Sequence, residues 1–144
     1  MRRYAKLSSL DPKLLKDIFN YFFNRCDKVN IYFPNTVQNQ DYPHITEFKK
    51  AFLAATHIIE DVEELSALEE TLEEKEGFSM VIASLTEEVK MLISNMPSSL
   101  HLDLGLIAGE KVLCYISSEN ECVIEADKDS DIFTSPLFND FKII

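Results

Sequence analysis

The chain has 144 residues, 46% of them hydrophobic, and a formal net charge of −11 at pH 7. This length and apolar content exclude a disordered chain and predict one globular domain, residues 1–144, that can bury its own core. No apolar stretch approaches the ~18 residues of a membrane span and no apolar region follows Arg2 and Arg3, so we expect a cytoplasmic protein that does not contact a membrane.

The first predicted element is a helix from Pro12 to about Cys26. Asp11 is a suitable N-cap, and proline is favoured at the first helical position. Apolar residues then recur at helical spacing and form one wide face; they are Leu14, Leu15, Ile18, Phe19, Phe22, Phe23 and Cys26.

A half-buried strand is predicted next, because Val29, Ile31 and Phe33 alternate with polar or aromatic residues before Pro34. Residues 35–44 are expected to form a polar loop. From Thr46 a second helical stripe begins and continues nearly to Gly77, roughly 45 Å if unbroken, and a break near His57 or Ser66 remains open. Its apolar residues are Phe48, Phe52, Ala55, Ile59, Val62, Leu65, Leu68 and Leu72.

The segment "GFSMVIAS" can be a strand or a helix, because short apolar runs do not distinguish the two. The following "SLTE" predicts a capping box with Ser84 as N-cap and Glu87 at the third helical position. The helix that it opens should end at Pro97.

Residues 101–126 contain three short runs rich in β-formers, separated by Gly109-Glu110 and by Ser118-Glu119-Asn120. They predict a three-stranded antiparallel meander. The tail, residues 127–144, should be a loop whose aromatic residues return to the sheet. The expected fold class is therefore α+β, with three helices packed on a small antiparallel sheet that ends in a C-terminal β-meander. The residues expected to be buried are Phe19, Phe22, Phe52, Ile59, Leu85, Val89, Leu92 and Val112.

No pattern in the chain predicts catalysis. There is no G-x-S-x-G, no P-loop and no G-x-G-x-x-G, and three glycines are too few for most phosphate-binding loops. A Cys–His pair assembled from distant positions and acid–base chemistry by paired carboxylates stay open as alternatives. We expect a protein that is not an enzyme and needs no cofactor.

Two patterns suggest a metal site, and neither is complete. Asp127, Asp129 and Asp131 alternate as in a calcium loop, but Ile132 and Phe138 stand where that loop needs Gly and Glu. His57 precedes Glu60 and Asp61 by about one helical turn, yet only His101 with Asp103 could supply a second element. We therefore expect no bound metal.

The three cysteines are too few for a disulfide framework. Cys114 and Cys122 could face each other across a hairpin. Two reduced thiols are the expectation and a redox pair is the open alternative.

The charge is unevenly distributed along the chain. Residues 1–50 carry a net charge of +4 and residues 51–144 carry −15. Between Glu60 and Glu74 there are eight carboxylates and no Lys or Arg. An acidic chain is repelled by nucleic acid and attracted to basic surfaces, so we expect a basic protein partner and no direct nucleic-acid binding, unless the basic cluster of Arg2, Arg3 and Lys6 provides it.

The acidic stretch is predicted to be the docking surface for that partner, because its like charges repel each other without the i, i+4 lysines that stabilise a solvated helix. Its best single positions, opposite the apolar stripe, are Glu63, Glu64, Glu70, Glu73 and Glu74. A second candidate patch consists of Asp127, Asp129 and Asp131. The competing interpretation is a solvated helix face that only keeps the protein soluble.

In size, acidity and lack of catalytic motifs, the chain resembles the bacterial immunity proteins of contact-dependent inhibition and other polymorphic toxin systems. The stretches that carry the resemblance are "EDVEELSALEETLEE" and "SSENECVIEADKDSD". It is a resemblance of class, from which no binding residue is carried over. It implies an inhibitor that neutralises a cognate nuclease-type toxin domain. The alternative is a phage-type mimic of nucleic acid or an acidic adaptor subunit of a larger complex.

Overall fold

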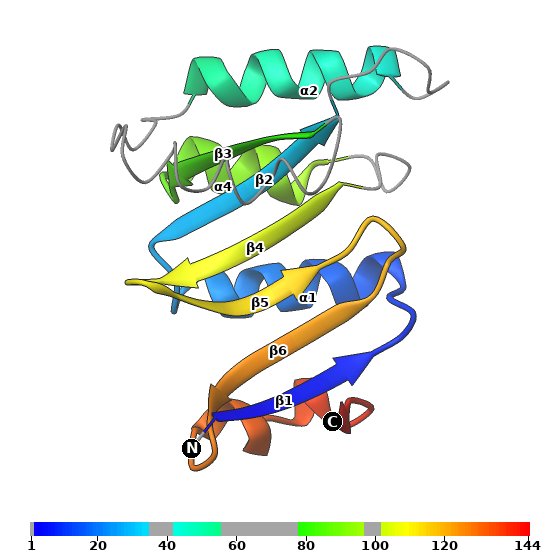
Figure 1. Cartoon of the computed structure of the whole chain (residues 1–144), viewed down its shortest axis with the longest axis vertical. Helices are drawn as coiled ribbons and strands as arrows, with labels where there is room; N and C mark the ends of the chain where they lie inside the picture. Colours follow the sequence, from blue (N-terminus) through cyan, green and yellow to red (C-terminus); the bar gives the residue numbers. More distant parts are fainter. Residues whose placement is uncertain (1, 35–41, 56–77, 97–101) are drawn as a thin grey trace.

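The computed structural model describes residues 2–34, 42–55, 78–96 and 102–144. The chain has an α+β fold, as predicted (Figure 1). Three helices are described: α1 (Pro12–Phe23), α2 (Tyr42–Ala55) and α4 (Glu87–Ser94). The strands are β1 (Arg2–Leu7), β2 (Lys28–Pro34), β3 (Phe78–Ser84), β4 (Asp103–Ala108), β5 (Lys111–Ile116), β6 (Cys122–Asp127) and β7 (Lys142–Ile143), and two short 3-10 helices, η1 (Asp131–Thr134) and η2 (Pro136–Phe138), precede β7.

The strands form one antiparallel sheet in the order β3-β2-β4-β5-β6-β1-β7. The predicted meander is present as β4, β5 and β6 in the middle of this sheet. The prediction of a small sheet is wrong, because β1 pairs with β6 and in turn with the C-terminal strand β7, which adds two strands beyond the meander. β1 is hard to recognise because "RRYAKL" offers only Ala5 and Leu7 to the core.

The core lies on one face of the sheet. In Figure 1, α1 and α4 lie behind the strands. Val29, Ile31 and Phe33 point to this side and are fully buried, and alternate residues of the other strands continue the same layer. Phe19 and Phe22 of α1 and Val89 and Ile93 of α4 pack in the same core. The rings of Phe48 and Phe52 of α2 lie 6.2 and 5.9 Å from that of Phe33.

The C-terminal tail returns to this core, as predicted. Phe138 and Phe141 are buried, and the Phe138 ring lies edge-on to Tyr21 of α1 at 5.1 Å between centroids.

Local signals determine the helix ends only in part. Asp11 caps α1 by accepting a hydrogen bond from the Leu14 N–H at 2.7 Å, as predicted. The capping box is wrong by two residues: Thr86 caps α4, because Ser84 is still in β3 and pairs with Lys28. The polar loop is also shorter than predicted, since α2 already includes residues 42–44. The ambiguous segment 78–84 is a strand.

The burial predictions hold for Phe19, Phe22, Phe52 and Val89. Leu85, which precedes α4, is only partly buried. Leu92 is partly buried as well, because Val89 and Ile93 are the residues of α4 that face the core. Val112 is partly buried as well, and it pairs with Ile107 on the other face of the sheet. Ile59 lies outside the described residues.

Candidate docking surface

The predicted docking residues of the acidic stretch, Glu63, Glu64, Glu70, Glu73 and Glu74, lie outside the described residues. The described part of the chain is nearly neutral: its 13 Lys and Arg face 15 Asp and Glu, a net charge of −2. The other −9 belongs to the remaining residues, and residues 56–77 alone hold nine acids and one base. The acidic excess is thus concentrated in one short part of the sequence.

The fold brings the basic N-terminus onto the acidic C-terminal half. Because β1 pairs with β6, Arg2 meets Glu125 at 3.1 Å and Asp127 at 3.6 Å, and Lys6 meets Glu121 at 3.0 Å. Exposed pairs of this kind add little stability, but they cancel each other's field.

The third base of the N-terminal cluster points to the opposite face. The guanidinium of Arg3 lies over the Phe133 ring, 5.6 Å from its centroid. With Arg2 and Lys6 paired to acids, the cluster is a weak candidate for nucleic-acid binding.

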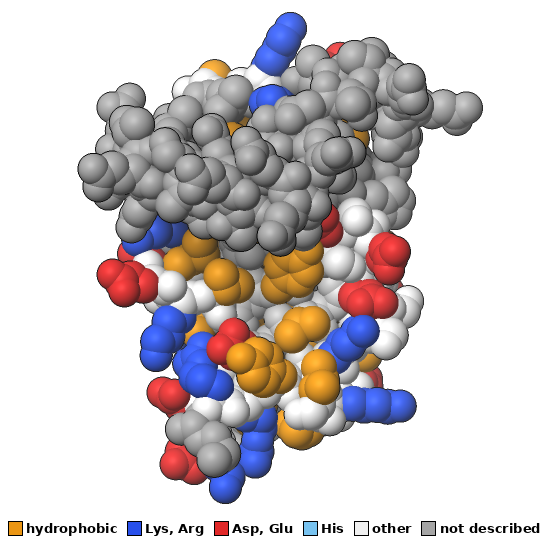
Figure 2. All heavy atoms as spheres, in the orientation of Figure 1, with side chains coloured by type: hydrophobic (Ala, Val, Ile, Leu, Met, Phe, Trp, Pro, Cys, Tyr) orange, Lys and Arg blue, Asp and Glu red, His pale blue; other side chains and the backbone are white. Residues whose placement is uncertain are grey.

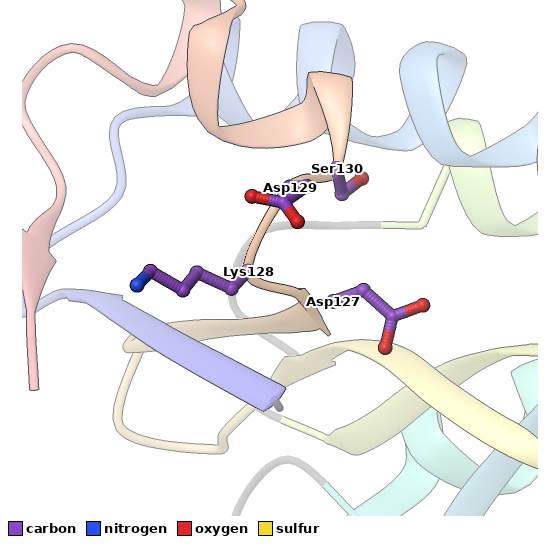
Figure 3. Close-up of a pocket in the computed structure, with 4 residues that line it drawn as sticks. All are labelled: Asp127, Lys128, Asp129 and Ser130. Carbon is purple, nitrogen blue, oxygen red and sulfur yellow. The ribbon is translucent and has the colours of Figure 1, made fainter.

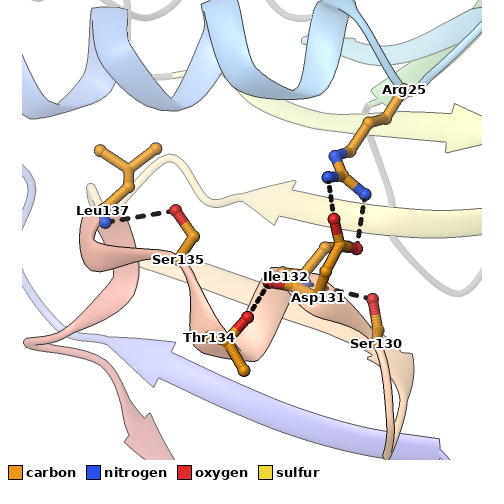
Figure 4. Close-up of polar contacts among 7 residues, drawn as sticks. All are labelled: Arg25, Ser130, Asp131, Ile132, Thr134, Ser135 and Leu137. Carbon is orange, nitrogen blue, oxygen red and sulfur yellow. Dashed lines mark hydrogen bonds and ion pairs between the residues drawn. The ribbon is translucent and has the colours of Figure 1, made fainter.

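Asp131 belongs to a structural contact between η1 and the end of α1 (Figure 4). The Arg25 guanidinium donates to both of its carboxylate oxygens, at 2.9 and 2.5 Å, and lies 4.7 Å from the Tyr21 ring centroid. These hydrogen bonds lower the pKa of Asp131. Its carboxylate is therefore engaged within the chain.

The side chains of the turn before η1 do not converge on a common point. In Figure 3, Asp127 and Lys128 point to opposite sides of the turn, and Asp129 lies farther along the chain, beside Ser130. Of the three aspartates, Asp129 alone has no ion pair with another described residue. The described ranges also contain no group of three His, Cys, Asp or Glu residues placed to hold a metal ion.

The opposite face of the sheet carries the larger surface feature. Figure 2 views this face and shows hydrophobic side chains over the middle of the sheet, with charged groups at the margins. In one row across the strands, Val123 is opposite Tyr115 and Tyr115 is opposite Gly105. In the neighbouring row Ile107 is opposite Val112. Ile107 is buried yet lies apart from the core behind the sheet.

A polar cluster lies at one end of this open face. Tyr32 on β2 is directly opposite Asp103 on β4, and Tyr115 on β5 is diagonal to it. Asp103 accepts a hydrogen bond from the Ser118 N–H at 2.6 Å, and its carboxylate lies near enough to Tyr115 to affect the ionisation of that residue. Burial, followed by the nearby Asp103 carboxylate, raises the pKa of Tyr115 to about 12 and also raises the pKa of Tyr32.

This cluster is not among the predicted sites. The sequence suggests Asp103 only as a metal partner of His101, which lies outside the described residues. The available signal was the period of two in "DLGLIA", which puts Asp103 and Gly105 on the face opposite Leu104 and Leu106.

Cys114 and Cys122 do meet inside the fold. Their sulfur atoms lie 3.6 Å apart on β5 and β6, both side chains are fully buried, and both are free thiols. Burial raises the pKa of Cys114 well above its usual value. The two side chains therefore pack as small core residues, and the expectation that they stay reduced remains a prediction.

No described helix combines the length and apolar character needed to cross a membrane. No family model matches the chain, and neither a curated protein nor a solved structure matches it.

Proposed function

We propose that this chain is a non-enzymatic inhibitor of the immunity-protein class, which neutralises a basic, nuclease-type toxin domain by docking on it. The observation that carries the proposal is the partition of charge: −2 on the described residues against −8 on residues 56–77. Acids kept only for solubility have no need to be concentrated. A nuclease must present Lys and Arg around its phosphate-binding site, and a dense carboxylate surface is complementary to it.

The proposed contact residues are Glu63, Glu64, Glu70, Glu73 and Glu74. Their effect should be chiefly on the association rate, which electrostatic steering raises by roughly 10- to 1,000-fold at low salt. The ion pairs of Arg2, Lys6 and Arg25 support this assignment. They neutralise several acids of the C-terminal half, so that the described residues carry little excess charge.

The test is reversal of three acidic charges together, Glu63→Lys, Glu70→Lys and Glu74→Lys, with binding to the partner recovered from the producing cell or from a neighbouring toxin gene. The matched control is Asp17→Lys, Glu47→Lys and Glu110→Lys, which changes the net charge equally at exposed positions. Association rates are measured at about 50 mM and about 300 mM salt, where screening differs strongly.

We expect the acidic-stretch variant to lose most of its association rate at low salt and the control to keep it, with thermal melting similar in both. Equal loss in the two variants would show that only net charge matters. Binding that is competed by DNA or RNA and is shared by unrelated basic proteins would favour the nucleic-acid mimic instead. Binding that the acidic-stretch variant retains would leave that stretch as a solvated face.

A further inference from the structure

We propose that the open sheet face forms a second part of the docking surface, on which Asp103, between Tyr32 and Tyr115, receives an arginine side chain of the basic partner. This inference rests on the proposed function for the identity of the partner. The arginine subsite itself is argued from the described residues.

The position of the Asp103 carboxylate allows it to bind a further cation. Asp103 is partly buried at the start of β4, on the face that the described helices α1, α2 and α4 leave uncovered. The Ser118 N–H, which donates to Asp103 Oδ1, fixes its orientation. A carboxylate can accept about four hydrogen bonds, so this donor leaves capacity for a guanidinium.

Asp103 has no basic counter-charge among the described residues. None of the ion pairs between described residues includes Asp103, although most of the neighbouring acids on β6 and its turns have a base. A partly desolvated carboxylate attracts a cation more strongly than an exposed one does, because solvent screens it less. The site is therefore electrostatically prepared for a positive group.

The same chain contains a comparable contact in which an arginine binds a carboxylate beside a tyrosine ring. Elsewhere in the same chain, Arg25 binds the Asp131 carboxylate with two nitrogen atoms while its guanidinium lies over the Tyr21 ring. Asp103 repeats two parts of that arrangement, a carboxylate with tyrosines beside it, and lacks the arginine among the described residues. Arginine is favoured over lysine because its planar guanidinium both matches a carboxylate and stacks on an aromatic ring.

The surface around Tyr115 is largely apolar. Gly105 separates Tyr115 from Asn30 in the same row. Val123 on the neighbouring strand β6 and Val112 on β5 itself flank the tyrosine. Apolar side chains around a charged contact exclude water and raise its contribution, as around the central residues of protein interfaces. The open face can thus supply affinity, whereas the acidic stretch supplies attraction at a distance.

The test is an NMR titration of the intact, ¹⁵N-labelled protein with N-acetyl-L-arginine amide, and in parallel with the lysine analogue. We expect saturable shifts of the Asp103, Gly105 and Ser118 amides, larger with arginine than with lysine. Asp103→Asn keeps an oxygen that can accept from Ser118 and removes the charge. It should weaken arginine binding about tenfold, as expected for the loss of a charge-assisted hydrogen-bonded pair. Glu110→Gln, at the other end of the β4–β5 hairpin, is the matched control and should bind like the wild type.

Shifts scattered over the surface, or equal binding by Asp103→Asn, would overturn the arginine subsite. The wild-type titration locates the site by itself, so the inference can be refuted even if Asp103→Asn does not fold. A partner that binds wild type and Asp103→Asn equally would refute the inference and leave the proposed function standing. Specific arginine binding without any basic protein partner would do the reverse.

Discussion

Gly105 should be the least replaceable glycine of the described sheet, and Gly105→Ala tests the geometry of the open face. A Cβ atom at this position would lie 2.3 Å from Asn30 Oδ1, 3.3 Å from Asn30 Cγ and 3.4 Å from Val112 Cγ1. Contacts this short require a neighbour to move. Asn30 is 8% exposed and its side chain is short, so moving it disturbs the packing and hydrogen bonding around it.

Overpacking of this kind costs about 1–3 kcal/mol. The loss of backbone freedom in the unfolded chain returns about 0.4–1 kcal/mol when glycine becomes alanine. We therefore expect a net destabilisation of about 1–2 kcal/mol, or a fall in the melting temperature of about 3–8 °C for a domain of this size. Urea unfolding measured by circular dichroism gives the free energy directly.

A double-mutant cycle identifies the cause. In an Asn30→Ala background the clash is absent, so Gly105→Ala should cost at least about 1 kcal/mol less than in the wild type. Gly109→Ala is the control: its φ of +64° makes alanine strained, but nothing lies within 4 Å of the added atom. Its cost of about 1 kcal/mol should be the same in both backgrounds. A Gly105→Ala variant as stable as the wild type, or two additive costs, would refute the close approach of Gly105 and Asn30.

Two further predictions concern ionisation and thiol reactivity. Tyr115 should ionise near pH 12, because burial and Asp103 raise its pKa. Its contribution to stability is therefore complete below pH 10 and is lost as the pH rises toward 12. The difference in tyrosinate absorbance between wild type and Tyr115→Phe isolates this group, and a transition near pH 10 would contradict the placement of Tyr115. The three buried thiols, including Cys26 with its pKa raised to about 12, should resist a thiol reagent until the protein unfolds and then all react. Rapid labelling of the native protein would contradict the burial of these thiols.

Features that depend on neighbouring residues in the chain were predictable from the sequence. Asp11, Pro12 and the apolar period specify α1, because a helix satisfies its own backbone within a few residues. The β4–β5–β6 meander follows for the same reason, since short turns join its strands. The prediction of Ser84 as the N-cap of α4 was wrong, because Ser84 pairs with the distant Lys28 and so still belongs to β3.

The α+β class, the amphipathic helix α1 and the concentration of acid between residues 56 and 77 can all be read from local sequence. Which charges cancel depends on long-range strand pairing, because Arg2 and Asp127 become neighbours through the β1–β6 pairing. The same holds for the open face, where Tyr32, Asp103 and Tyr115 come together from three strands. Local sequence sets the hydrophobic periodicity and therefore the face of the helix or strand on which a side chain lies. Strand register between distant segments determines which charged and aromatic groups become its neighbours and how far it is exposed to solvent.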